Sequence, residues 1–176
     1  MTTASFTNRT AAQRDSRDFG EMRRCGLIAS IGLFALAVGV LVYLTDRTPH
    51  ASILPSLRRG APGVFGVLGL WLPSFVHPLA FGLFTAAVLP ARPGLQYAAC
   101  AFWCVVDVAF ELGQHPGVSA QLAAAIDHGL GSLQFAARLA NYFRLGTFDW
   151  GDIAAVVLGA LAAAVVVCLM SQSRQS

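Results

Sequence analysis

The chain has 176 residues, of which 56% are hydrophobic and 12% are charged, and its formal net charge is +3. Soluble domains carry about 25% charged residues. Half that share, with the apolar residues gathered in long runs, indicates an integral membrane protein and excludes an ordinary soluble domain. Every basic residue is arginine. The arginines are spread over termini and loops, which argues against a nucleic-acid-binding face.

The four cysteines fall in or beside apolar runs, and no histidine or third cysteine joins them at the spacing of a zinc site. We therefore interpret them as small packing residues and predict no disulfide framework, no metal and no cofactor. The cysteines are Cys25, Cys100, Cys104 and Cys168.

The first membrane span is predicted over residues 25–44. This run has the ~20 apolar residues that a transmembrane helix needs, and no signal-peptide cleavage pattern follows it. Residues 1–24 are polar and arginine-rich, and we interpret them as a cytoplasmic tail, with helix from Ala11 onward as one option. Small residues in the span would let another helix approach closely. They are Gly26, Ser30, Gly32 and Gly39.

The prolines of the second span allow two interpretations of where its helix begins. A loop over 45–62 is rich in turn residues, and the apolar stretch that follows, 63–89, is longer than one span requires. We predict a break near Pro73, a helix over 72–89 capped by Ser74, and a short re-entrant or interfacial segment before it. The alternative is one tilted helix, kinked at Pro73 and Pro78.

Two further spans complete the predicted bundle, at 95–113 and 153–170. The long connection between them has two weakly amphipathic parts, which favour short helices that lie on the membrane or cap the bundle. Thr147 or Asp149 is a suitable N-cap for the last span, and residues 171–176 form a short tail. The predicted fold is all-α: a polytopic membrane protein with four transmembrane helices, a re-entrant or interfacial segment and an amphipathic connection.

Polar residues in the spans mark the candidate site. Asp107, Glu111 and Gln114 stand at i, i+4 and i+7, so they share one helix face. An acid near the bilayer centre costs about 2.5–3.5 kcal/mol, so such groups usually face the bundle or a wet cavity. We expect Asp107 to face His77 or another helix. His77 is either a functional residue or a neutral imidazole bonded to a neighbouring helix.

The distribution of arginines predicts the orientation. Four spans place both termini on one side, and seven of the twelve arginines then fall on that side. This bias, with Arg23 and Arg24 directly before the first span, places both termini in the cytoplasm. The remaining polar candidates then gather near the outer face, where the third span ends and the fourth begins. They are Glu111, Gln114, Asp149 and Asp152.

Several motifs resemble those of the VanZ-like family of small bacterial membrane proteins. They are Leu72 to His77, Phe102-Trp103, the F-E-L-G-Q run at 110–114, the T-F-D-W-G-D run at 147–152, and L-G-A at 158–160. The sequence departs from the family pattern at Gly146, where members often have arginine, and at Val156, where they have asparagine. The resemblance implies a protein of the bacterial inner membrane and cell envelope with a link to glycopeptide (teicoplanin) susceptibility. It implies no substrate.

Three functions are compatible with these residues. The first is a non-enzymatic envelope protein that binds a lipid, a cell-wall precursor or a partner protein through the polar cluster. In it, Glu111 and Gln114 either bond to Asp149, Asp152 or His77 and fix helix packing, or line a shallow ligand groove. The second is an intramembrane enzyme in which His77, Asp107 and Glu111 hold a metal or act as acid and base on a lipid-linked substrate. The third is a small proton-coupled carrier or assembly subunit with Asp107 as relay. No H-E-x-x-H and no nucleophile motif is present in the sequence, so we favour the first.

Overall fold

The computed structural model describes residues 4–46, 65–131 and 133–172, which form six α-helices and no strand. Four of the helices are long and apolar enough to cross a membrane. The prediction of an all-α, multi-pass membrane protein is therefore confirmed. Most of the predicted loop at 45–62, and most of the tail at 171–176, lie outside the described residues. The helices are α1 Ala4–Asp46, α2 Leu68–Val88, α3 Pro93–Gly113, α4 Ser119–Leu130, α5 Gln134–Leu145 and α6 Trp150–Gln172.

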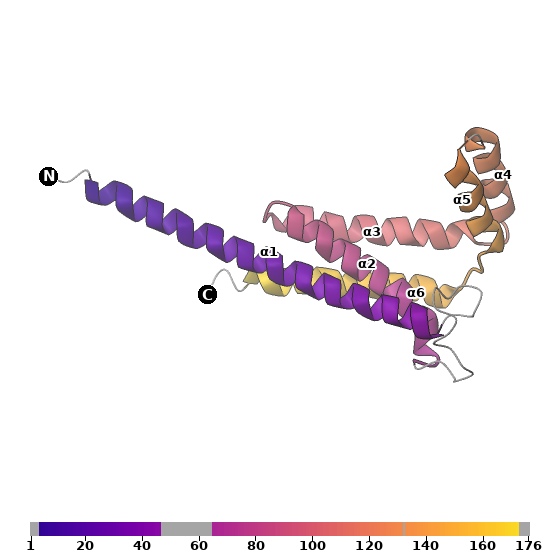
Figure 1. Ribbon diagram of the computed structural model, residues 1–176, viewed down its shortest axis with the longest axis horizontal. Coiled ribbons are helices and arrows are strands. Elements are labelled where there is room, and N and C mark those ends of the chain that lie inside the picture. The colour runs from indigo at the N-terminus through magenta and orange to yellow at the C-terminus, as the bar shows by residue number, and fades with distance from the viewer. Residues whose placement is uncertain (1–3, 47–64, 132, 173–176) are drawn as a thin grey trace.

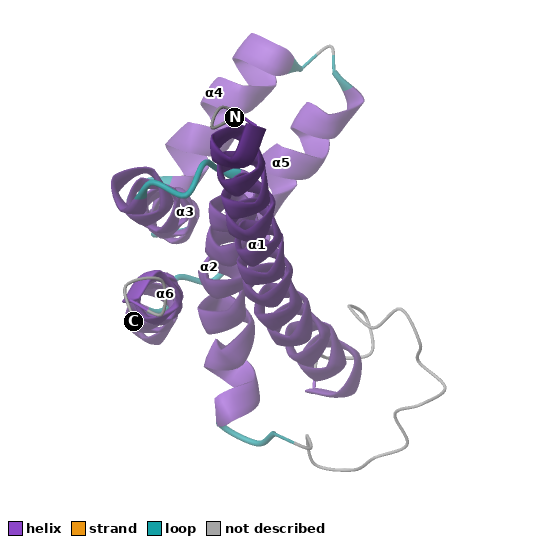
Figure 2. Cartoon of the chain, turned by 90° about the vertical axis from the view of Figure 1, so that its left-hand side faces the viewer, coloured by secondary structure: helices purple, strands orange, loops and turns teal. Residues whose placement is uncertain are grey.

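Helix α2 is the centre of the bundle. It packs against α1, α3 and α6, and α3 also packs against α6 (Figures 1 and 2). Helix α1 touches α6 only slightly, because α2 lies between α1 and the rest of the bundle. Helix α2 therefore has neighbouring helices on three sides.

Helix α1 is longer than the sequence suggested. Its 43 residues span roughly 65 Å at ~1.5 Å per residue, about twice the ~30 Å hydrocarbon core. The apolar part is Phe19–Asp46, and the N-terminal part projects beyond the bundle (Figure 1). From Ala4 onward, the predicted tail is thus continuous with the helix of the first span.

The predicted break near Pro73 is wrong. Helix α2 begins at Leu68 and contains both Pro73 and Pro78, so Ser74 is not its cap and no separate re-entrant segment ends there. A turn over residues 65–67 precedes the helix. Helices that cross membranes tolerate proline because neighbouring helices and side chains satisfy the freed backbone groups, and α2 has neighbours on three sides. The alternative of a single helix through both prolines describes α2 better.

Small residues join α2 to α1 and α6. A Cβ atom added to Gly159 would overlap the carbonyl oxygen of Phe75, so the backbones of α6 and α2 nearly touch. A Cβ on Gly39 would stand 2.9 Å from Cγ1 of Val76, and the close approach expected at Gly39 is therefore confirmed. Gly26 has nothing within 4 Å and does not take part.

The connection between the third and last spans folds as two short helices, as predicted. Helices α4 and α5 form a hairpin that lies across one end of the bundle, beside the C-terminal end of α3 (Figure 1). Arg144 of α5 forms an ion pair with Asp127 of α4. This hairpin lies next to the polar residues of α3.

Candidate functional site

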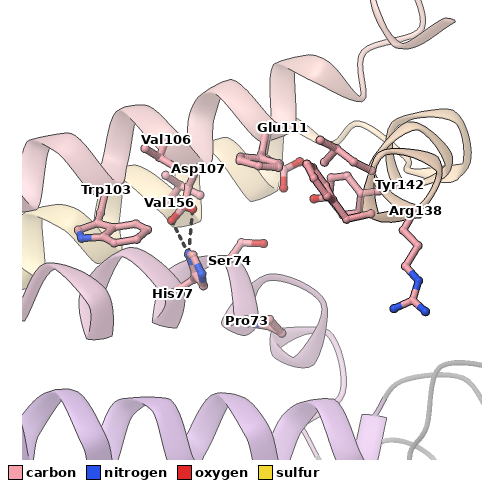
Figure 3. Close-up of a pocket in the computed structure, with 13 residues that line it drawn as sticks. Pro73, Ser74, His77, Trp103, Val106, Asp107, Glu111, Arg138, Tyr142 and Val156 are labelled. Atoms are coloured by element: carbon pink, nitrogen blue, oxygen red, sulfur yellow. Dashed lines mark hydrogen bonds and ion pairs between the residues drawn. The ribbon is translucent and has the colours of Figure 1, made fainter. Parts of the chain in front are cut away.

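A cavity of about 730 Å³ lies between α2, α3 and α5, with one residue of α6 in its wall. Its apolar walls come mainly from aromatic and aliphatic side chains, including Trp103, Val106, Phe110, Phe135 and Leu139. Its polar groups come from three different helices (Figure 3). They are Ser74 and His77 of α2, Asp107 and Glu111 of α3, and Arg138 and Tyr142 of α5.

His77 and Asp107 form the polar contact at the centre of this cavity. Nδ1 of His77 stands 2.8 Å from Oδ1 and 2.9 Å from Oδ2 of Asp107. The His77 side chain is 47% exposed, whereas the Asp107 side chain is 13% exposed. The expected contact between the two is present. It gives the acid of α3 a partner in a position where an unpaired carboxylate would be costly.

The contact fixes the chemistry of the imidazole ring. An ionised Asp107 accepts a hydrogen bond from Nδ1–H, so a neutral His77 keeps the lone pair on Nε2. Among the described residues, Nε2 has no hydrogen-bond partner. The ring therefore presents an acceptor when neutral, and a donor when protonated, to whatever occupies the cavity.

Aromatic side chains hold the imidazole in place. The ring of His77 lies 4.5 Å from that of Phe81 and 6.0 Å from that of Trp103, measured between centroids. The indole Nε1–H of Trp103 donates to Oγ1 of Thr85 at 2.9 Å, which orients the indole. His77 is thus positioned by packing as well as by its carboxylate.

Tyr142 connects the hairpin to the end of α3. Nε2 of Gln114 donates to the Tyr142 hydroxyl at 2.7 Å, and the ring of Tyr142 contacts Phe110. Burial raises the pKa of the Tyr142 phenol, and the negative charges of Glu111, Asp107 and Asp152 raise it further. The phenol therefore stays protonated and can donate a hydrogen bond.

Asp149 and Asp152 lie at the start of α6, outside the cavity. Oδ1 of Asp149 accepts the backbone N–H of Gly151 at 2.8 Å, so Asp149 is an N-cap, as one prediction had it. Its Oδ2 accepts from Nε1 of Trp71 at 3.2 Å. The Gly151 N–H, and then the Trp71 indole, lower the pKa of Asp149. Asp152 accepts a hydrogen bond from Oγ of Ser74 at 2.7 Å.

The structure therefore divides the six candidate residues into two sets. His77, Asp107 and Glu111 line one cavity. Gln114, Asp149 and Asp152 hold neighbouring elements together instead, with Gln114 bonded to Tyr142 rather than to either aspartate. No group of three or more His, Cys, Asp or Glu residues within the described ranges could hold a metal ion.

Sequence reasoning missed three residues with polar groups in the cavity. Ser74 was assigned to a cap, although it precedes His77 by three positions and so shares its helix face. Arg138 and Tyr142 stand at i and i+4 on α5, on one side of a helix that was recognised only as amphipathic. The i, i+4 spacing of Arg138 and Tyr142 could have predicted that this side of the helix presents polar groups to a neighbouring element.

No family model, no curated protein and no solved structure matches this chain significantly. Its site is therefore interpreted from its own residues.

Proposed function

We propose that the protein is a non-enzymatic bacterial inner-membrane protein that binds an amphiphilic ligand, a lipid or a lipid-linked cell-wall precursor, in the cavity beside His77 and Asp107. The observation that carries the proposal is the composition of this cavity, which combines apolar walls with six polar side chains inside a membrane bundle. Ligand pockets are typically ~300–1,000 Å³, mostly apolar, with a few placed polar groups. The cavity of about 730 Å³ fits this description.

The arrangement of the polar groups indicates what the ligand must offer. Nε2 of His77 accepts a hydrogen bond when the ring is neutral, the Tyr142 hydroxyl donates one, and the exposed Arg138 supplies a positive charge. A head group with hydroxyls and a phosphate can bind all three side chains: a hydroxyl donates to His77, and phosphate oxygens accept from Tyr142 and pair with Arg138. Its acyl or prenyl chain would lie along Trp103, Val106 and Phe110.

The membrane and the envelope role form part of the same proposal. The arginine distribution supports cytoplasmic termini. With that orientation, the end of the bundle where α3 ends and α6 begins, beside the cavity, faces outward. The motifs that resemble the VanZ-like family include His77 and Glu111, both in the cavity wall. This likeness supports an envelope role connected with glycopeptide susceptibility.

Lipid co-purification tests the proposal. The full chain is purified in mild detergent, and bound lipids are identified by mass spectrometry for the wild type, Asp107→Asn and a control. Asp127→Asn is the matched control, because it makes the same chemical change on α4, away from the cavity. We expect a specific lipid to accompany the wild type and the control and to be depleted several-fold in Asp107→Asn.

Equal lipid content in all three proteins would contradict the proposal. Protein level is measured beside lipid content, and Glu111→Gln is carried through the same comparison with a glycopeptide-susceptibility assay. Loss of the phenotype at normal protein level supports a binding role for Glu111. An unchanged phenotype removes this residue from the site.

The contact between His77 and Asp107 also favours a second candidate, an intramembrane enzyme. A carboxylate on Nδ1 orients the ring and leaves the lone pair on Nε2, as required for a general base acting on a hydroxyl or a water molecule. Incubation of the purified protein with the lipid it retains separates the two functions. A ligand recovered unchanged supports binding, and a time-dependent product that disappears in His77→Gln supports catalysis.

A further inference from the structure

A second polar cluster lies at the opposite end of the bundle, where α2 and α6 end and α3 begins. Nη2 of Arg24 on α1 donates to Oε1 of Gln96 at 2.8 Å and to Oγ of Ser171 at 2.9 Å. Gln96 is 1% exposed, and its Nε2 donates to the carbonyl oxygen of Ala86 at 2.9 Å. Ser171 in turn donates to the carbonyl of Val167. The guanidinium is thus fixed by groups from α3 and α6.

All of these partners are neutral. Within the described residues, Arg24 takes part in no ion pair. Its Nε is buried and donates to none of them, and the recorded hydrogen bonds engage Nη2 but not Nη1. A partly buried cation without a counter-charge is unfavourable. Such a guanidinium, held rigid with donors to spare, is suited to bidentate binding of a phosphate or carboxylate.

A cavity of about 460 Å³ opens beside this group. Arg24 and the exposed Arg23 supply its charge, Leu27 and Met170 supply apolar wall, and none of the described residues that line it is acidic. The two arginines stand where the apolar part of α1 begins, which is the level of lipid head groups. The site therefore combines positive charge with an apolar flank at one membrane surface.

We propose that Arg24 is the centre of a binding site for the phosphate group of an acidic phospholipid. The phosphate lies in the cavity against Nη1 of Arg24, Arg23 adds electrostatic attraction, and the first part of the acyl chain runs along Leu27 and Met170. A zwitterionic lipid gains less here, because its ammonium group meets two arginines and no carboxylate among the described lining residues. The bound lipid supplies the missing counter-charge and links α1 to α6, which otherwise touch only slightly.

Native mass spectrometry of the purified full chain tests this site. Phosphatidylglycerol and phosphatidylcholine with identical acyl chains are titrated separately, and inorganic phosphate is added as a competitor. Arg24→Gln removes the charge at the site. Arg92→Gln is the matched control, since Arg92 is exposed at the turn before α3 on the same end of the bundle and lines neither cavity. Leu27→Trp is designed to fill the cavity without replacing any hydrogen-bond partner of Arg24.

We expect the wild type to prefer phosphatidylglycerol, and Arg24→Gln to lower its affinity by about tenfold, as for the loss of a charged hydrogen bond. Arg92→Gln leaves the preference intact, and Leu27→Trp reduces it.

Equal losses in the two arginine variants mean general electrostatic attraction and overturn the proposal. Full competition by inorganic phosphate indicates a free-anion site and overturns the lipid assignment. If Arg24→Gln does not fold, Leu27→Trp decides, because unchanged binding in that variant overturns the proposal.

Discussion

The two sides of α2 differ in how they meet their neighbours. Toward α6, Gly159 brings the backbone close to the carbonyl group of Phe75, and toward α1, Gly39 lies against the side chain of Val76. Toward α3, larger polar and aromatic side chains meet through hydrogen bonds and leave a cavity of about 730 Å³. In a membrane, close van der Waals packing and interhelical hydrogen bonds replace the hydrophobic effect as the force between helices. In this bundle the close packing lies toward α1 and α6, and the hydrogen bonds lie toward α3 and, through Ser74 and Asp152, at the start of α6.

The largest effect is expected on the packed side. Gly159→Ala places a Cβ atom on the carbonyl oxygen of Phe75, which is backbone and cannot rotate away. Overpacking of this kind costs about 1–3 kcal/mol, so we expect a clear drop in the thermal unfolding temperature in detergent. Gly129→Ala is the control, because nothing lies within 4 Å of its Cβ position. Similar unfolding temperatures for Gly159→Ala and the wild type would show that α2 and α6 are not in close contact.

A smaller effect, the coupling energy between His77 and Asp107, is expected on the polar side. His77→Ala leaves Asp107, only 13% exposed, without its partner, and Asp107→Ala leaves His77 alone. A lost partner costs about 1–3 kcal/mol when the remaining group is buried. The double variant should therefore be less destabilised than the sum of the single variants, with a coupling of about 1 kcal/mol. Additive effects in the unfolding measurements would mean that the contact contributes nothing to stability.

The sequence predicts helices better than it predicts how they meet. Long apolar runs and turn residues were enough to locate four spans and the two helices of the connection. The break at Pro73 was wrong because a proline in an isolated helix is costly, whereas in α2 the surrounding helices favour a continuous segment. Helix propensities, which describe a single segment, do not include the stabilisation that neighbouring helices give to α2.

The same limit explains the candidate site. The contact between His77 and Asp107 could be expected, because each is an ionisable group in a span and needs a polar partner. The contacts of Ser74 with Asp152 and of Gln114 with Tyr142 could not. They depend on the rotation of each helix about its axis. In this chain, the residues that face lipid and the residues that pack against other helices are both apolar. The hydropathy pattern therefore does not show which side of a helix faces the bundle.

Asp149 gives a pH-dependent test of the junction where α6 meets α2. The Gly151 N–H and the Trp71 indole lower its pKa below 3.8 in the folded protein. A lowered pKa in the folded state means that the contribution of Asp149 to stability is complete above the unfolded pKa of about 3.9 and is lost as the pH falls through the folded value. We expect a carboxyl ¹³C titration of Asp149 to have its midpoint below 3.8.

Trp71→Phe sharpens this test. Without the indole N–H, the Asp149 midpoint should rise, but it should stay below that of an unperturbed aspartate, because the Gly151 N–H is the larger cause of the shift. A midpoint unaffected by Trp71→Phe would mean that α2 does not contact the start of α6 through this pair.

The smallest effect is expected at the ion pair between Asp127 and Arg144, which lies in the hairpin and belongs to neither side of α2. Both side chains are at least 40% exposed, so water and salt screen their attraction. Asp127→Asn should cost about 0.2–1 kcal/mol, and the difference from the wild type should shrink when unfolding is measured at high salt. A larger, salt-independent loss would contradict this view. It would mean that the hairpin is fixed by this pair rather than by the packing of Phe110 against Tyr142 and Phe143, whose ring centroids lie 5.9 Å and 5.7 Å from that of Phe110.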